Sequence, residues 1–225
     1  MSAPWAAQPT LRRVPEPLKL TTADGVTLEA EISIPSPTPR CGVVLCHPHP
    51  QYGGTMRSIV ISALFDTLPT RGVACLRFNF RGVEGSEGTH DFGNLERVDA
   101  ETAVGALHER LSPGTPLILT GWSFGADMAL SVRDERVTAW LAIAPPLVVV
   151  HDVEGLAADP RAKLLALAQH DEYRDPAEIT ELAERWANTD VHVVGGASHF
   201  FVGRTDRLVE LAAGYVDRLA PAPSS

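Results

Sequence analysis

The chain has 225 residues and a formal net charge of −9, from 19 basic and 28 acidic residues. This length can bury a full hydrophobic core, and 44% hydrophobic with 21% charged residues is ordinary for a soluble globular protein. The basic stripe that a nucleic-acid-binding protein usually carries is missing. The longest mostly apolar stretch, residues 139–150, is broken by two prolines and is too short to span a membrane. The composition therefore argues against nucleic acid and membrane as partners.

Both ends of the chain differ from its middle. Residues 1–17 are rich in proline and alanine without the continuous apolar segment of a signal peptide, and residues 220–225 read Ala-Pro-Ala-Pro-Ser-Ser. We expect two disordered tails around a single domain at residues 18–219. The three cysteines are an odd number, which in a chain without an export signal predicts reduced thiols and a cytoplasmic location. Cys41 and Cys46 are predicted to face opposite sides of one strand.

The predicted elements begin with a hairpin. Residues 18–22 and 26–34 alternate apolar and polar side chains around Asp24-Gly25, a dipeptide that favours a tight turn. Six later runs are short and almost continuously apolar, as is typical of parallel strands buried on both faces: 42–46, 73–78, 117–120, 138–143, 163–167 and 191–194. Helical patterns lie between or after them, at 56–68, 95–111, 124–132, 176–186 and 204–219. This alternation predicts an α/β fold in which helices cover both faces of a mostly parallel sheet.

A G-x-S-x-G sequence occupies residues 121–125, after the predicted strand at 117–120 and before a predicted helix. This strand–turn–helix context is that of a nucleophile elbow, in which the serine stands on a turn too tight for bulky flanking residues. Ser123 is therefore the candidate nucleophile. The alternative is a glycine-rich turn whose serine caps the following helix.

A serine hydroxyl needs a base, and in this type of fold the chain order is serine, acid, histidine. Of the eight histidines, His199 alone follows the last predicted strand and is the candidate base, with an ordinary surface-loop histidine as the alternative. Asp171 follows the preceding strand and is the candidate orienting acid. Asp152, Glu172 and Asp175 remain alternatives to it, because a loop aspartate often only forms a turn.

An oxyanion hole needs two backbone N–H groups. Phe124, the residue after the nucleophile, supplies one. The second is expected from the loop after the strand at 42–46, where prolines flank His49 and leave it as the donor between them. The side chains of Cys46, His47 and His49 suggest zinc as an alternative, but no spaced partner cluster completes a site, so we predict no metal.

Two further segments bear on the site. The glycine-rich loop at residues 77–88 carries Arg81 but lacks the lysine spacing of a phosphate-binding loop, which favours a scaffold role. The connection at residues 145–161 is too short for a cap domain, although it allows one short helix. We therefore expect a shallow, open pocket that prefers short acyl groups. Phe200 and Phe201 are expected either to wall this pocket or to lie in the core.

Five motifs in combination resemble the small lidless α/β-hydrolases of bacteria, which are distantly related to the dienelactone hydrolases: residues 47–56, 76–83, 121–125, 144–146 and 196–201. The resemblance implies an eight-stranded sheet and a Ser123–Asp171–His199 triad without a cofactor. It also implies oxyanion donors from His49 and Phe124. The chain departs from the dienelactone hydrolases in having serine where they have a cysteine nucleophile, so their substrate is not expected here.

The expected activity is hydrolysis of a small-molecule ester or thioester through an acyl-serine. Two alternatives remain open. The first is an acyltransferase or cyclase that uses the same triad, and the second is a non-catalytic binding protein with this fold. The sequence leaves the natural substrate and the oligomeric state open.

Overall fold

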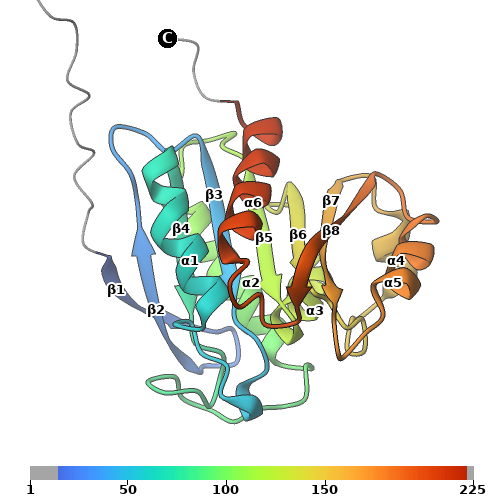
Figure 1. Ribbon diagram of the computed structural model, residues 1–225. Coiled ribbons are helices and arrows are strands. Elements are labelled where there is room, and N and C mark those ends of the chain that lie inside the picture. The colour runs from blue at the N-terminus through green and yellow to red at the C-terminus, as the bar shows by residue number, and fades with distance from the viewer. Residues whose placement is uncertain (1–14, 222–225) are drawn as a thin grey trace, which may run out of the picture.

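A computed structural model describes residues 15–221 of the chain, in which one eight-stranded sheet lies between two layers of helices (Figure 1). The strands are β1 (Glu16–Thr21), β2 (Thr27–Ser33), β3 (Cys41–Cys46), β4 (Val73–Phe78), β5 (Leu117–Trp122), β6 (Ala139–Ile143), β7 (Ala162–His170) and β8 (Thr189–Ser198). Strand β1 begins two residues before the domain start expected from the sequence. The rest of the two expected tails lies outside the described residues, apart from residues 15, 220 and 221.

The strand order is β1-β2-β4-β3-β5-β6-β7-β8. Strand β2 runs antiparallel to both of its neighbours, and every other neighbouring pair is parallel. The hairpin predicted around Asp24-Gly25 therefore forms one edge of a mostly parallel sheet, as expected. Within residues 15–221 no cap domain is inserted into this arrangement.

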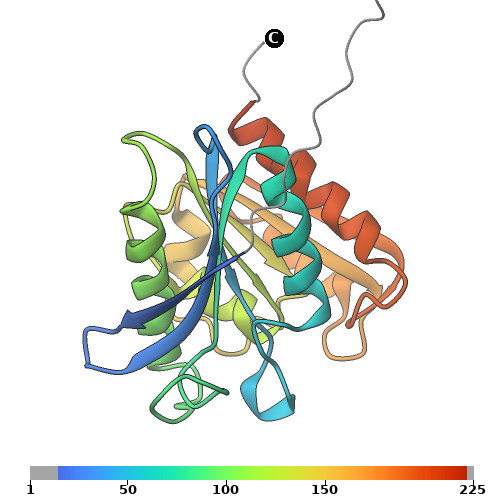
Figure 2. The same cartoon turned by 90° about the vertical axis from the view of Figure 1, so that its left-hand side faces the viewer.

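The α-helices are α1 (Ile59–Thr67), α2 (Glu96–His108), α3 (Phe124–Ser131), α4 (Val153–Ala158), α5 (Pro176–Ala183) and α6 (Thr205–Leu219), with short 3-10 turns at Pro50–Tyr52 and Leu68–Arg71. Helices α1 and α6 pack on one face of the sheet, and α2 and α3 pack on the other (Figure 2). Each face buries its own hydrophobic cluster. Cys41 belongs to the α1/α6 cluster and Cys46 to the opposite one, as the strand period predicts, and all three cysteines are buried free thiols.

Strand β8 differs from its prediction. The sequence suggested a strand buried on both faces, but β8 is the last strand of the sheet and most of its residues are exposed or half-buried. Only Val194 and Ala197 are buried in it. An edge strand has a neighbour on one side alone, and apolar content does not distinguish an edge from the centre of a sheet.

Three strands extend further than predicted: β5 to Trp122, β7 to His170 and β8 to Ser198. Their ladders continue past the glycine or polar residue at which a sequence pattern ends, for example where Trp122 pairs with Ile143. Asp171 and His199 therefore follow their strands directly. None of the helices in residues 15–221 has the length and apolarity that crossing a membrane requires.

Candidate active site

Ser123 occupies the turn between β5 and α3 with φ 56° and ψ −122°, a backbone conformation that is strained for any residue other than glycine. Its N–H donates to the carbonyl of Ile143 at 2.8 Å. A Cβ on Gly121 would lie 2.0 Å from the carbonyl oxygen of Gly125, and a Cβ on Gly125 would lie 2.3 Å from that of Cys46. The turn therefore requires both glycines, as the motif predicts. The Ser123 side chain makes no helix-capping hydrogen bond.

The three side chains predicted to act together lie in one hydrogen-bonded line. The Nε2 atom of His199 is 2.9 Å from the Oγ of Ser123, and its Nδ1 atom is 2.9 Å from both carboxylate oxygens of Asp171. The imidazole and the carboxylate are almost fully buried. With its proton on Nδ1, the imidazole donates to the carboxylate and keeps the Nε2 lone pair for the serine hydroxyl.

The other acids proposed from the sequence have different partners. Asp152 and Asp175 cap the first turns of α4 and α5 by accepting backbone N–H groups. Glu172 accepts the backbone N–H of His199 at 3.1 Å and so supports the histidine loop rather than its ring. Of these four acids, Asp171 is the one whose carboxylate faces the imidazole.

Aromatic side chains support the histidine. The indole N–H of Trp122 donates to the carbonyl of His199 at 3.0 Å, which ties the β8 loop to the elbow. The ring of Tyr173 lies 4.5 Å from the imidazole centroid. Phe200 lines the pocket, whereas Phe201 is buried in the core, so the two sequence alternatives each hold for one residue. The Trp122 bond joins residues 77 positions apart and left no signal in the local sequence.

The expected oxyanion donors both line the cavity beside Ser123. Within the described residues, the backbone N–H groups of His49 and Phe124 donate to no other protein group. The ring of His49 lies 4.9 Å from that of Phe124, and its Nδ1 accepts the N–H of Gln51 at 3.2 Å. Burial, together with the nearby His90, lowers the pKa of His49. The imidazole is therefore biased toward its neutral form.

His47 is buried and holds the same loop through both of its ring nitrogens. Its Nε2 accepts the N–H of Phe80 at 3.0 Å, so its Nδ1–H donates to the carbonyl of Pro48 at 2.6 Å. Burial lowers the pKa of His47 to about 4, which keeps this neutral tautomer. Both ring nitrogens are thus occupied by the backbone, which argues against the zinc alternative. The described residues contain no group of three or more His, Cys, Asp or Glu placed to hold a metal ion.

Arg81 has the scaffold position predicted for it. Its buried guanidinium bonds to Asp99 of α2 at 2.6 Å and to Asp24 of the first hairpin at 2.9 Å. Burial opposes the charge of Arg81, but the bonds to Asp99 and Asp24 raise its pKa above the ordinary value. The loop at residues 77–88 is therefore fastened to two elements by an ion-pair network.

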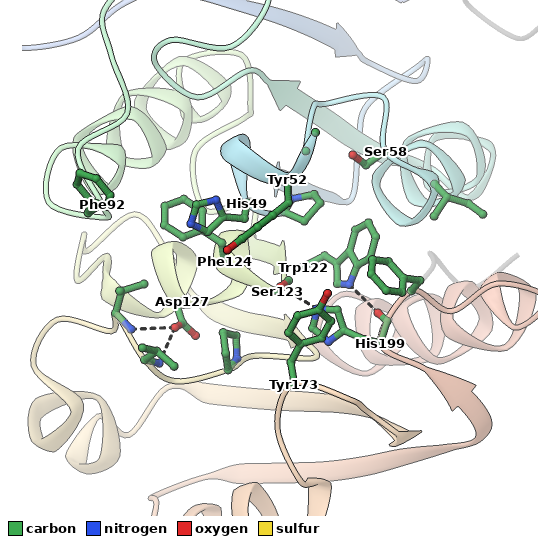
Figure 3. A pocket seen from close by; sticks show the side chains of 18 residues that line it. His49, Tyr52, Ser58, Phe92, Trp122, Ser123, Phe124, Asp127, Tyr173 and His199 are labelled. Carbon is green, nitrogen blue, oxygen red and sulfur yellow. Dashed lines mark hydrogen bonds between the residues drawn. The ribbon is translucent and has the colours of Figure 1, made fainter.

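A groove of about 810 Å³ opens over Ser123 (Figure 3). The loop after β3 forms one wall, and residues 146, 148 and 149 of the β6–α4 connection form another. Helix α4 is the one short helix that the connection allows, and the connection forms a wall of the groove rather than a cap domain.

One buried carboxylate in this wall was not among the residues predicted from the sequence. Asp127 of α3 is fully buried and accepts the backbone N–H groups of Leu147, Val148 and Val149 at 2.8 to 3.1 Å. Burial raises the pKa of Asp127 to about 6, against the effect of these three bonds. The sequence signal was an aspartate within the otherwise apolar first turns of a helix.

Comparisons with known proteins agree with the fold described above. No family model matches the chain. An uncharacterized protein of Rickettsia prowazekii is 32% identical over 191 residues, which cover 80% of each chain. An α/β serine hydrolase homologue from Coxiella burnetii is 29% identical, with a TM-score of 0.78 over 89% of this chain and 97% of its own.

A serine hydrolase without a lid from Xanthomonas campestris is 26% identical, with a TM-score of 0.80 over 96% of this chain and all of its own. These relatives share the sheet and the helix layers almost from end to end. The chain therefore belongs to the small, lidless α/β-hydrolases.

Proposed function

We propose that this protein is a serine hydrolase that cleaves a carboxylic ester or thioester through an acyl-enzyme, with Ser123, His199 and Asp171 as its triad. The observation that carries the proposal is the continuous line of 2.9 Å contacts from the Ser123 hydroxyl through His199 to Asp171. A serine on a strained turn at the floor of an open groove, with an imidazole on its oxygen, has the arrangement that acyl transfer requires.

In the first half of the reaction, the Nε2 of His199 takes the proton from the Ser123 hydroxyl as the oxygen attacks the carbonyl carbon. The negative charge that develops on the carbonyl oxygen is stabilised by the N–H groups of His49 and Phe124. Asp171 stabilises the imidazolium. The imidazolium then protonates the departing alcohol or thiol, which leaves an acyl-serine.

In the second half, a water molecule takes the place of the departed alcohol. His199 removes its proton while the water oxygen attacks the acyl carbon, and the proton returns to Ser123 as the acid leaves. The groove is open to solvent, which favours hydrolysis over an acyltransferase or cyclase reaction. The assembled triad likewise favours an enzyme over a non-catalytic binding protein.

An active-site-directed fluorophosphonate tests this proposal. The reagent should label Ser123, and mass spectrometry of the digested protein identifies the labelled peptide. Ser58 also lines the groove, but no histidine contacts its hydroxyl, so it is an internal control that should remain unmodified. Ser123→Ala should abolish both labelling and hydrolysis of para-nitrophenyl acetate while the protein stays folded. Wild-type hydrolysis by the folded variant would refute the proposal.

A further inference from the structure

Large apolar side chains that are exposed to solvent gather around the groove. The described residues expose nine large hydrophobic side chains, and six of them line it: Tyr52, Ile59, Phe92, Val148, Tyr173 and Phe200. The exposed fractions of Tyr52, Val148 and Phe92 are 87%, 76% and 68%. A soluble protein keeps such side chains together in water mainly where they bind something.

Few charged side chains line the groove. No lysine or arginine is among the described residues that line it. Its one acidic residue, Asp127, directs its carboxylate at three backbone N–H groups of the wall. An anionic group on a ligand would therefore lose water in the groove without gaining a cation, which is unfavourable.

The position of Phe92 is held by a buried carboxylate. Phe92 has φ 53°, in the left-handed region that a bulky residue rarely adopts. The N–H groups of the residues on either side, Asp91 and Gly93, donate to the carboxylate of fully buried Glu96 at 2.7 and 2.8 Å. These two hydrogen bonds offset the backbone strain at Phe92. They hold its aromatic ring exposed to solvent at the groove.

Val148 is presented in the same way. Asp127 holds the backbone of residues 147–149, and Ser131, one helical turn later, accepts the N–H of His151 at 2.9 Å. The two wall segments also touch each other, since the Nε2 of His151 lies 3.3 Å from the carbonyl oxygen of Gly93. Both exposed side chains therefore stand on fixed backbone.

The direction of the substrate follows from the chemistry of His199. Figure 3 shows Phe92 and Asp127 on one side of Ser123, and His199 and Tyr173 on the other. The imidazole must protonate the leaving oxygen, so the alcohol part lies on the Tyr173 side. The acyl part then extends toward Phe92.

We propose that the site selects uncharged esters with a bulky apolar group on each side of the ester bond, in place of the short acyl groups expected from the sequence. The acyl group packs against Phe92 and Val148, and the alcohol group packs against Tyr173 and Phe200. A carboxylate or phosphate at the far end of either group weakens binding. This inference rests on the proposed function for the orientation, whereas the binding preference stands on the groove itself.

Three para-nitrophenyl esters test the charge preference: the hydrocinnamate, its para-carboxylate and the methyl ester of that carboxylate. The carboxylate should have a kcat/KM about 30-fold below those of the two neutral esters. The methyl ester controls for size. Equal values for the carboxylate and its methyl ester would overturn the proposal.

Variants test the orientation. Phe92→Ala should reduce the preference for hydrocinnamate over acetate as the acyl group by about 10-fold, with little change in the preference for benzyl over methyl as the alcohol. Tyr173→Ala should do the reverse. Val202→Ser is the matched control, because Val202 is exposed but lies outside the groove. Equal effects of both groove variants on both preferences would contradict the assignment of the two sides.

A binding measurement separates this inference from the proposed function. The Ser123→Ala variant should not hydrolyse the esters. Isothermal titration calorimetry on this variant therefore compares the affinities of the neutral and carboxylate hydrocinnamates directly. The neutral ester should bind at least about 10-fold more tightly. If this preference holds while wild-type protein hydrolyses nothing, the proposed function fails and the binding preference stands. If the two esters bind equally well and the wild-type protein hydrolyses the neutral one, the binding preference fails and the proposed function stands.

Discussion

Replacing Asp127 with asparagine should remove a specific part of the dependence of folding stability on pH. The pKa of Asp127 is about 6 in the folded protein against an ordinary value of 3.8, because burial disfavours the carboxylate. The folded state therefore binds this proton more tightly than the unfolded state does. The resulting stabilisation is fully present below pH 3.8 and is lost as the pH rises through about 6.

The size of this effect follows from the two pKa values. Their difference corresponds to about 3 kcal/mol of unfolding free energy in all, of which about 2 kcal/mol falls between pH 4 and pH 7. Asparagine has no such titration. The amide NH₂ of asparagine faces a backbone N–H group that the carboxylate of Asp127 accepts in the wild type. This loss lowers the stability of the variant, but by an amount that is independent of pH, so it cancels when stabilities at two pH values are compared.

The assay is urea denaturation of wild type and Asp127→Asn near pH 4, pH 5, pH 6 and pH 7. Relative to wild type, the variant should become more stable by about 2 kcal/mol across this range. Asp66→Asn, at an exposed position on α1, is the control and should follow the wild-type curve. Identical pH dependence of wild type and Asp127→Asn would refute the assignment of a raised pKa to this buried carboxylate.

Substitutions at three sites, with controls at two others, test the triad, the oxyanion loop and the elbow. Asp171→Asn should lower kcat for para-nitrophenyl acetate by about four orders of magnitude, through the wrong imidazole tautomer, while Asp152→Asn stays near wild type. His49→Ala should keep most of this activity because any residue but proline supplies the N–H, whereas His49→Pro should lose about 100-fold in kcat. Gly125→Ala should lower the free energy of unfolding by at least about 3 kcal/mol in thermal or urea denaturation, because its Cβ would lie 2.3 Å from a carbonyl oxygen. Gly214→Ala, in open space on helix α6, should instead raise it by about 0.5 kcal/mol.

The nucleophile turn could be predicted because its requirements are local. Gly121 and Gly125 lie two residues from Ser123, and the close backbone approaches that exclude a Cβ involve the same short turn and the adjacent end of β3. A short sequence pattern can therefore carry the whole constraint. The same holds for the hairpin at Asp24-Gly25, where turn and strands are contiguous.

The other triad members could be predicted through topology rather than through local pattern. Parallel strands end at the same edge of the sheet, so residues that follow β5, β7 and β8 converge there, although Asp171 and His199 are 28 positions apart. Topology alone did not distinguish Asp171 from Glu172, its neighbour in the chain. That choice depends on which carboxylate reaches the ring and which reaches the backbone N–H of His199.

Chain length alone did not predict how the walls of the groove are held. A connection of 17 residues cannot form a cap domain, and a shallow site followed from that count. Length says how much chain is present, but the course of the wall depends on the conformation of its backbone. Phe92 and Leu147 have positive φ angles, and the adjoining backbone is held by Glu96 and Asp127. Two buried carboxylates thus turn short loops into fixed walls. For Asp127 the sequence feature that marks such a support is an acid within the otherwise apolar pattern of α3, whereas Glu96 begins a charged segment and is not marked in this way.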